Sequence, residues 1–264
     1  MPWLWSALMP HPPVIVPEVG CGREHEASVT VGGIERLAEL ISDRRPECLL
    51  VLSPHHPYVP LSLTLNAAPR LKGSFAPFGA SVPFEMNTST KLRPLAEYLG
   101  ISGITVRDEN IPDVTSDHGS LVPLYFIRKA LRKLGLELPD VVLASPIGLG
   151  AEKSLKFGEL LASFDDGSNW GLLASGDLSH RLTSYAPAGY SPCGKKFDAA
   201  VVAALSSVDP QKLLYLTPKE REEAGECGLC SVMAMLGFCS VLHRTIEVIS
   251  YEGPFGVGYC NALG

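Results

Sequence analysis

The sequence predicts an α/β protein that folds as a single domain over residues 1–264, with a central, mostly parallel or mixed sheet and helices on both faces. Two observations support this fold class. Apolar runs of strand length alternate along the chain with stretches of helical periodicity, a pattern typical of βα units. No repeat, low-complexity tract or long polar linker interrupts the alternation, so the sequence marks no boundary between domains.

The predicted strands are short apolar runs that end near Pro, Gly or Ser. The first covers residues 3–8 and is closed by Pro10. Residues 48–53 form an apolar run stopped by Pro54, which is typical of a buried parallel strand. Further strands are predicted over residues 141–145, 170–175 and 244–251, with several short β-like pieces within residues 58–86.

The predicted helices carry apolar residues three or four positions apart. Within residues 28–42, Ile34, Leu37, Leu40 and Ile41 fall on one face, and the same spacing recurs within residues 120–134. The remaining helices are predicted over residues 91–99, 152–164, 197–206, 219–224 and 228–239.

Composition restricts the function classes. The chain is 46% hydrophobic, carries a formal net charge of −6 and has no stripe of Lys and Arg, which argues against nucleic-acid binding. Its seven cysteines, an odd number, suggest no disulfide framework and fit a reducing cytosol. The apolar N-terminus lacks a positive region and is interrupted by four prolines before residue 14. We therefore expect a cytoplasmic protein that is neither exported nor membrane-spanning.

Five of the seven histidines stand at or near the ends of apolar runs, in loop-like settings. In α/β proteins, the carboxyl edge of the sheet is where binding and catalytic sites are built. Imidazoles that converge there from separate segments suit a metal site, with spare bases for proton transfer. The five residues are His11, His55, His56, His118 and His180.

The first three of these histidines lie in stiff, proline-flanked loops. His11 is held in M-P-H-P-P, where the prolines restrict the backbone. His55 and His56 follow the strand predicted over residues 48–53. Adjacent residues of an extended chain point to opposite sides, so we expect only one of this pair to face a site.

The other two histidines have carboxylates nearby. His118 follows Asp117 just before a predicted helix, where Ser116 or Asp117 is a plausible N-cap. The positive end of that helix disfavours an imidazolium, so a neutral His118 can donate one hydrogen bond to a bound oxygen species. Asp177 and His180 follow a buried strand and can form a carboxylate–imidazole couple that orients a base. The absence of a G-x-S-x-G elbow argues against a serine hydrolase.

Residues 222–230 combine carboxylates with cysteines. Cys227 and Cys230 form one C-x-x-C, which is weak evidence for zinc without a second pair. Glu226 precedes this pair. Two histidines and one carboxylate are the protein ligands of many non-haem Fe(II) sites, and this chain contains the residue types for such a site. The Gly-rich segment 251–259 lacks the G-x-G-x-x-G spacing of a nucleotide loop.

Six motifs, in this order, resemble those of the class III extradiol dioxygenase catalytic-subunit (LigB-like) superfamily. They are M-P-H-P-P-V-I-V-P-E-V-G, S-P-H-H-P, D-H-G-S-L-V-P-L-Y-F-I, A-S-G-D-L-S-H, A-G-E-C-G-L and S-Y-E-G-P-F-G-V-G-Y. The most similar branch is the dioxygenase-like domain at the N-terminus of AmmeMemoRadiSam system protein A, and the Memo proteins are more distant. The second domain of that branch is expected to be missing from this chain.

The resemblance implies roles for individual residues. His11 and His55 match the two iron-ligand histidines, and His55 is preferred to His56 because the family pattern is Ser-x-His after the strand. His180 matches the catalytic base, and His118 matches the histidine that hydrogen-bonds the bound dioxygen or the substrate oxygen. Asp177 is expected to orient His180.

The third metal ligand is left open between two neighbours. Glu226 best matches the glutamate of ring-cleaving members, whereas Memo-like relatives place a cysteine there, and Cys227 is the next residue. A carboxylate favours Fe(II), whereas a thiolate favours copper or zinc.

The resemblance thus implies extradiol cleavage of a catechol-like aromatic diol by O₂, with Fe(II) as cofactor. The alternative is a Memo-like, metal-binding redox or accessory protein that works with a radical-SAM partner. A binding module that kept the fold and lost the chemistry is a third reading. A small aromatic substrate and O₂ are the expected partners, and both a homo-oligomer and a separate small subunit remain open.

Overall fold

The computed structural model describes residues 2–264, which form an α/β fold around one eight-stranded sheet and a separate two-stranded hairpin. The strand order of the large sheet is β6-β3-β7-β2-β8-β1-β10-β9, and the hairpin pairs β4 with β5. The strands are β1 (Trp3–Met9), β2 (Cys48–Leu52), β3 (Leu63–Asn66), β4 (Arg70–Gly73), β5 (Phe84–Asn87), β6 (Val106–Glu109), β7 (Asp140–Ser145), β8 (Trp170–Ser175), β9 (Glu247–Glu252) and β10 (Tyr259–Leu263).

The four central strands run parallel. β1 pairs with β8, β8 with β2, and β2 with β7, all in parallel register. At one side β10 pairs antiparallel with both β1 and β9, and at the other β3 pairs antiparallel with β7. The central strands are buried along almost their whole length because helices cover both faces of the sheet. The predicted mixed α/β fold is therefore confirmed.

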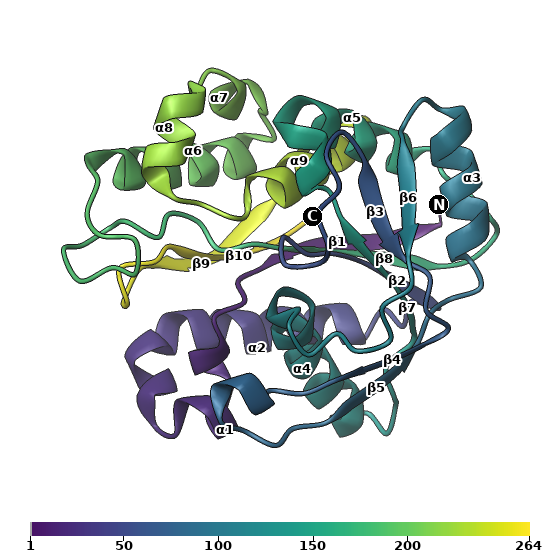
Figure 1. Cartoon of the computed structure of the whole chain (residues 1–264), viewed down its shortest axis with the longest axis horizontal. Coiled ribbons are helices and arrows are strands. Elements are labelled where there is room, and N and C mark those ends of the chain that lie inside the picture. The colour runs from purple at the N-terminus through teal and green to yellow at the C-terminus, as the bar shows by residue number, and fades with distance from the viewer. Residues whose placement is uncertain (1) are drawn as a thin grey trace.

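Helices form a layer on each face of the sheet. In Figure 1, α2 and α4 lie below the sheet, and α5, α6 and α9 lie above it. The helices are α1 (Pro17–Gly20), α2 (Ser28–Ser42), α3 (Leu92–Ile101), α4 (His118–Lys133), α5 (Gly150–Ala162), α6 (Pro192–Ser207), α7 (Gln211–Leu214), α8 (Pro218–Ala224) and α9 (Leu229–Val241).

Each layer has its own apolar core. On one side, Phe157 of α5 and Phe238 of α9 pack with Trp3 of β1 in a cluster that also includes α3 and α6. On the other side, Ile34 of α2 and Phe126 of α4 pack in a cluster that includes the β4–β5 hairpin. Alternate residues of the parallel strands contribute to the two clusters, which is how a buried strand serves both faces of a sheet.

Each strand and helix that the sequence predicts is present, with ends that shift by a few residues. The structure adds elements that the sequence pattern did not show: α1, α7, β6 and β10. The last of these, β10, follows the Gly-rich segment. It is a buried strand between β1 and β9, because only residues 253–258 form the turn.

No single helix within residues 2–264 is long and apolar enough to cross a membrane. One bent pair, α8 with α9, passes the same length and composition test together, with a bend of 118° between them. The residues of α9 are almost all buried in the core of the molecule. All seven cysteines have free thiols.

Candidate metal centre

The candidate site lies where three neighbouring parallel strands end. In the order β2-β8-β1, the carboxyl end of β2 leads to His55, that of β8 to Asp177 and His180, and that of β1 to His11. Parallel strands bring their carboxyl ends to the same edge of the sheet, so segments distant in sequence meet there. His118 joins them as the first residue of α4.

Three imidazoles converge at this edge. The Nε2 atoms of His11 and His55 are 3.1 Å apart. Potential ligand atoms of His11, His55 and His118 all lie within 4.8 Å of one another, and this is the one such group of His, Cys, Asp and Glu side chains within residues 2–264. His55 and His118 are stacked, with ring centroids 4.0 Å apart. Because His11 is 1% exposed, whereas His55 is exposed, the cluster has a buried floor and an open mouth.

These histidines are held in the neutral form. Burial, together with the nearby His118 and His180, lowers the pKa of His11 well below its ordinary value. Burial and the charge of His11 lower the pKa of His55 to about 3. Burial also lowers the pKa of His118. A neutral imidazole offers a lone pair to a metal ion without first losing a proton.

A second network holds the loops that carry His55 and His118. Ser53 Oγ accepts a hydrogen bond from the His55 backbone N–H at 3.2 Å and donates one to Asp117 Oδ1 at 2.5 Å. Asp117 is the N-cap of α4, and its Oδ1 accepts a hydrogen bond from the Ser120 N–H at 3.1 Å. Of the two N-cap candidates in the sequence, Ser116 and Asp117, the structure thus has Asp117. The side chain of His56 faces away from the cluster toward Asp117, with Nδ1 3.8 Å from Oδ2. Only His55 of the pair therefore joins the cluster.

The carboxylate of Asp177 anchors the floor of the site. Its Oδ1 accepts a hydrogen bond from the His11 backbone N–H at 2.8 Å, and its Oδ2 lies 3.9 Å from His11 Nε2. Burial raises the pKa of Asp177 to about 6, although the charges of His180 and His118 act in the opposite direction. Nδ1 of His180 is buried and has no hydrogen-bond partner within residues 2–264, so the hydrogen-bonded couple of Asp177 and His180 that the sequence suggested is not formed, because the Asp177 carboxylate is engaged by His11.

Asp198, which sequence reasoning missed, supports the loop that carries His180. Its Oδ1 accepts from the Ser179 N–H at 2.8 Å, and its Oδ2 accepts from the Tyr251 hydroxyl at 2.7 Å. Burial raises the pKa of Asp198 to about 6. Asp198 lies on the buried face of α6, outside the motifs recognised in the sequence.

The side chains of Glu226 and Cys227 point to different parts of the structure. Cys227 Sγ lies 3.5 Å from His11 Nε2 and 3.6 Å from the carbonyl oxygen of Asp177. Glu226 Oε2 instead accepts a hydrogen bond from the Leu229 N–H at 2.7 Å, at the start of α9. The thiol is thus among the atoms closest to the imidazoles, whereas the carboxylate serves a helix end.

Two glycines allow Cys227 to come this close. The Cα of Gly228 packs against Gly176, so a Cβ added at Gly176 would lie 2.4 Å from it. A Cβ added at Gly228 would lie 2.8 Å from the carbonyl oxygen of Asp177. The backbones of the two loops therefore touch, and a side chain at either glycine would push Cys227 away from His11.

An aromatic side chain borders the open side of the cluster. The ring of Phe78 stands edge-on to His118 with centroids 5.3 Å apart and is 37% exposed. Phe78 closes a short 3₁₀ turn, Ala76–Phe78, in the segment between β4 and β5. An exposed ring in this position offers an apolar wall to a flat aromatic molecule.

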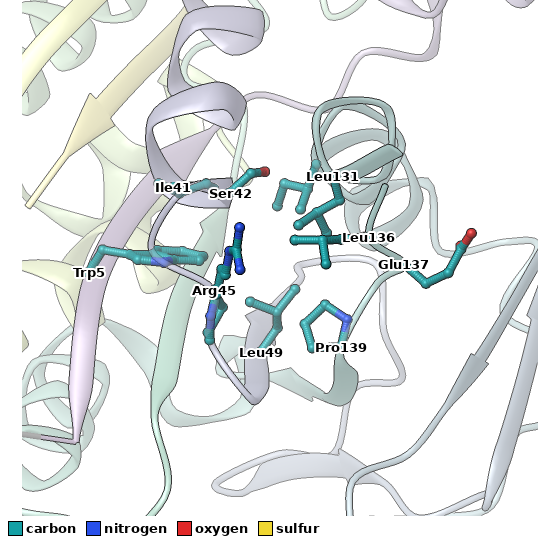
Figure 2. A pocket seen from close by; sticks show the side chains of 11 residues that line it. Trp5, Ile41, Ser42, Arg45, Leu49, Leu131, Leu136, Glu137 and Pro139 are labelled. Carbon is teal, nitrogen blue, oxygen red and sulfur yellow. The ribbon is translucent and has the colours of Figure 1, made fainter. Parts of the chain in front are cut away.

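A separate apolar cavity of about 150 Å³ lies at the opposite end of the strands. Figure 2 shows its walls, formed by Trp5 of β1, Leu49 of β2, and Leu131 and Leu136 at and after the end of α4. None of the candidate site residues lines it, so it is distinct from the histidine cluster.

The family model of the catalytic LigB subunit of aromatic ring-opening dioxygenase matches residues 6–261. The chain belongs to the LigB family. The match covers each of the segments that meet at the histidine cluster. Membership places the protein in a superfamily of metal-dependent, dioxygenase-like enzymes, and the buried histidine cluster is a suitable place for such a metal.

Two further proteins are similar to this chain. Protein CA_C1420 of Clostridium acetobutylicum is 33% identical over 267 residues, which cover 96% of this chain and 55% of that protein. The chain thus spans about half the length of the curated relative it matches. The solved structure of the uncharacterized protein JW3007 from Escherichia coli K12 superposes with a TM-score of 0.66, 17% identity and 98% coverage of both chains. This second likeness shows a shared fold.

Proposed function

We propose that this protein is a non-haem, metal-dependent oxidoreductase of the dioxygenase type that opens the ring of a catechol-like aromatic diol with O₂. His11 and His55 are the proposed metal ligands. The observation that carries this proposal is the convergence of neutral imidazoles at the carboxyl edge of a LigB-family sheet, with Nε2 atoms 3.1 Å apart. Two imidazoles plus one further protein ligand leave open positions on a metal ion for substrate.

The donor set fits a divalent metal ion. Burial and the charges of neighbouring histidines lower the pKa values of His11 and His55, so both rings stay neutral and available as ligands. When bound, Fe(II) supplies the redox chemistry between the diol and O₂.

The other residues of the site have roles in binding and proton transfer. His180, next to the Asp177 charge, is the proposed base that takes a proton from a substrate hydroxyl. His118, neutral at pH 7, is the proposed donor of a hydrogen bond to an oxygen of the reacting molecules. Phe78 provides an apolar wall beside His118 and helps to exclude water from the site.

A second candidate function is favoured by one contact. The 3.5 Å separation of Cys227 Sγ and His11 Nε2 supports a His-His-Cys site rather than one completed by Glu226. Thiolate ligation favours copper or zinc, and a protein with such a site would be a Memo-like redox or accessory protein that acts with a radical-SAM partner. The identity of the retained metal separates this candidate from the iron-dependent dioxygenase.

The test of the first candidate is O₂ consumption by iron-loaded protein with a panel of catechols, followed by optical detection of the ring-opened product. We expect diol-dependent uptake that is lost in His11→Ala and His55→Ala. His25→Ala, which changes an exposed histidine in the turn before α2, is the matched control and is expected to keep full activity. Background uptake by iron-loaded wild type with every diol would refute the ring-cleavage proposal.

A further inference from the structure

A proline inside α4 leaves one carbonyl of that helix without its usual partner. Pro123 lies within His118–Lys133, and in an α-helix the N–H of residue 123 would bond the carbonyl of residue 119. Proline has no N–H, so the Gly119 carbonyl cannot be satisfied in this way. A buried carbonyl in this state requires another donor.

That donor is a serine from the neighbouring strand. Ser175, the last residue of β8, places Oγ 2.5 Å from the Gly119 carbonyl oxygen. The same Oγ lies 2.8 Å from Nδ1 of His11. A serine hydroxyl has one proton to donate, and a carbonyl oxygen can only accept. The proton therefore goes to Gly119, and Ser175 must accept from His11, whose Nδ1 carries the hydrogen.

We infer that Ser175 is a positioning residue that fixes His11 in the Nδ1–H tautomer and so reserves the Nε2 lone pair for a metal ion. The inference rests on the proposed metal site but concerns a residue that touches no reacting atom. In this account, Pro123 has a role as well. It frees the Gly119 carbonyl, which in turn orients the Ser175 hydroxyl to accept from His11.

The surroundings leave His11 no alternative arrangement. Ser175 is fully buried and His11 is 1% exposed, so bulk water does not compete for the Nδ1–H. The His11 backbone N–H is held by Asp177 Oδ1 at 2.8 Å. The free Nε2 faces His55 Nε2 at 3.1 Å and Cys227 Sγ at 3.5 Å. A partner on the second ring nitrogen is the usual way in which a metal-binding histidine is oriented.

The tautomer can be measured in the metal-free protein. Nitrogen NMR of protein labelled with ¹⁵N-histidine distinguishes a protonated from an unprotonated ring nitrogen, and the His11→Gln spectrum assigns the signals of His11. We expect a protonated Nδ1 and an unprotonated Nε2 in wild type, and a mixture of tautomers in Ser175→Ala. A wild-type His11 that carries its proton on Nε2 would overturn the inference, whatever metal the protein binds.

The functional readout is metal affinity, measured by competition between the protein and a chromophoric chelator for Zn²⁺ and Co²⁺. We expect Ser175→Ala to weaken binding by about 10–100-fold, as is typical for loss of such a partner. Ser145→Ala is the matched control, because Ser145 is a fully buried serine at the end of β7 whose Oγ has no hydrogen-bond partner among the described residues. It is expected to bind metal like wild type.

The outcomes separate the two proposals. Failure of wild type to bind either ion would refute the proposed metal centre, and the NMR result would still decide the tautomer. Equal affinities of wild type and Ser175→Ala would overturn the positioning role. Should Ser175→Ala not fold, Ser175→Cys keeps the position filled but offers a much weaker acceptor, and it is expected to shift tautomer and affinity in the same direction.

Discussion

The thiol of Cys227 lies 3.5 Å from Nε2 of His11, although 216 residues separate them in the chain. The contact exists because β1 and the loop after β8 meet at one edge of the sheet, and Gly228 packs directly on Gly176. Glu226, one position earlier, turns its carboxylate to the first turn of α9. The neighbours therefore have different roles, and each can be tested.

The first prediction concerns the third metal ligand. Cys227→Ser is expected to lower metal affinity at least 10-fold, because a serine hydroxyl is a poor replacement for a thiolate. Glu226→Gln, which keeps an acceptor for the Leu229 N–H, is expected to bind metal like wild type. X-ray absorption of the metal-loaded protein provides a direct check, since sulfur and nitrogen ligands lie at different distances. Loss of metal in Glu226→Gln alone would restore the carboxylate as the ligand.

The second prediction separates hydrogen bonding from metal ligation at His118. His118→Gln keeps a donor of similar reach but places it differently, so we expect full metal occupancy with kcat lowered by about 10²–10³-fold, the usual effect of losing a donor to a developing charge. Metal content by mass spectrometry and diol-dependent O₂ uptake are measured on the same sample. Loss of the metal would instead identify His118 as a ligand, as its membership of the three-histidine group allows.

The third prediction concerns substrate binding. Removal of the Phe78 ring in Phe78→Ala takes away the apolar wall beside His118, so KM for an aromatic diol is expected to rise about 10-fold, since an aromatic pair contributes about 0.5–1.5 kcal/mol beyond its buried area. The value of kcat should change less, because Phe78 has no polar atom to offer the reaction. Phe78→Leu keeps apolar volume and serves as the comparison. An unchanged KM in Phe78→Ala would place the substrate elsewhere.

The fourth prediction is a pH dependence of stability. Burial raises the pKa of Glu226 to about 7, from an ordinary value of 4.5. Between these values the folded protein holds a proton that the unfolded chain has released, so the contribution of Glu226 to stability is lost as pH rises. The unfolding free energy of Glu226→Gln minus that of wild type should therefore increase by up to about 3 kcal/mol as the pH rises from 4.5 to 8.

Urea unfolding of the metal-free proteins at several pH values measures this difference. Glu222→Gln, which changes an exposed carboxylate on α8, is the control and should follow wild type at every pH. Parallel curves for wild type and Glu226→Gln would show that Glu226 ionises in the folded protein as it does in the unfolded chain.

The sequence pattern was sufficient for the central strands and the main helices. Runs such as residues 48–53 and 170–175 are buried on both sides, and this makes them apolar throughout and easy to recognise. The strand β10 was missed because Asn261 interrupts a short run that follows a Gly-rich turn. Its burial depends on β1, which lies more than 240 residues earlier in the sequence.

The histidines of the site could be found because each follows a strand or precedes a helix, and strand ends share one edge. The choice between Glu226 and Cys227 could not be made in this way, since it depends on the direction of two adjacent side chains after a turn. The partner of His11 was equally hidden. Ser175 stands in the motif A-S-G-D-L-S-H, and the missing N–H of Pro123 explains why its hydroxyl is oriented as it is.

The most direct test of the account is the metal content of protein purified without oxygen and reloaded with Fe(II), in wild type, His11→Ala and the exposed-site control His25→Ala. We expect about one tightly held ion per chain in wild type and in the control, and none in His11→Ala. Equal metal content in wild type and His11→Ala, or no retained metal in wild type, would contradict a metal centre built on His11 and His55.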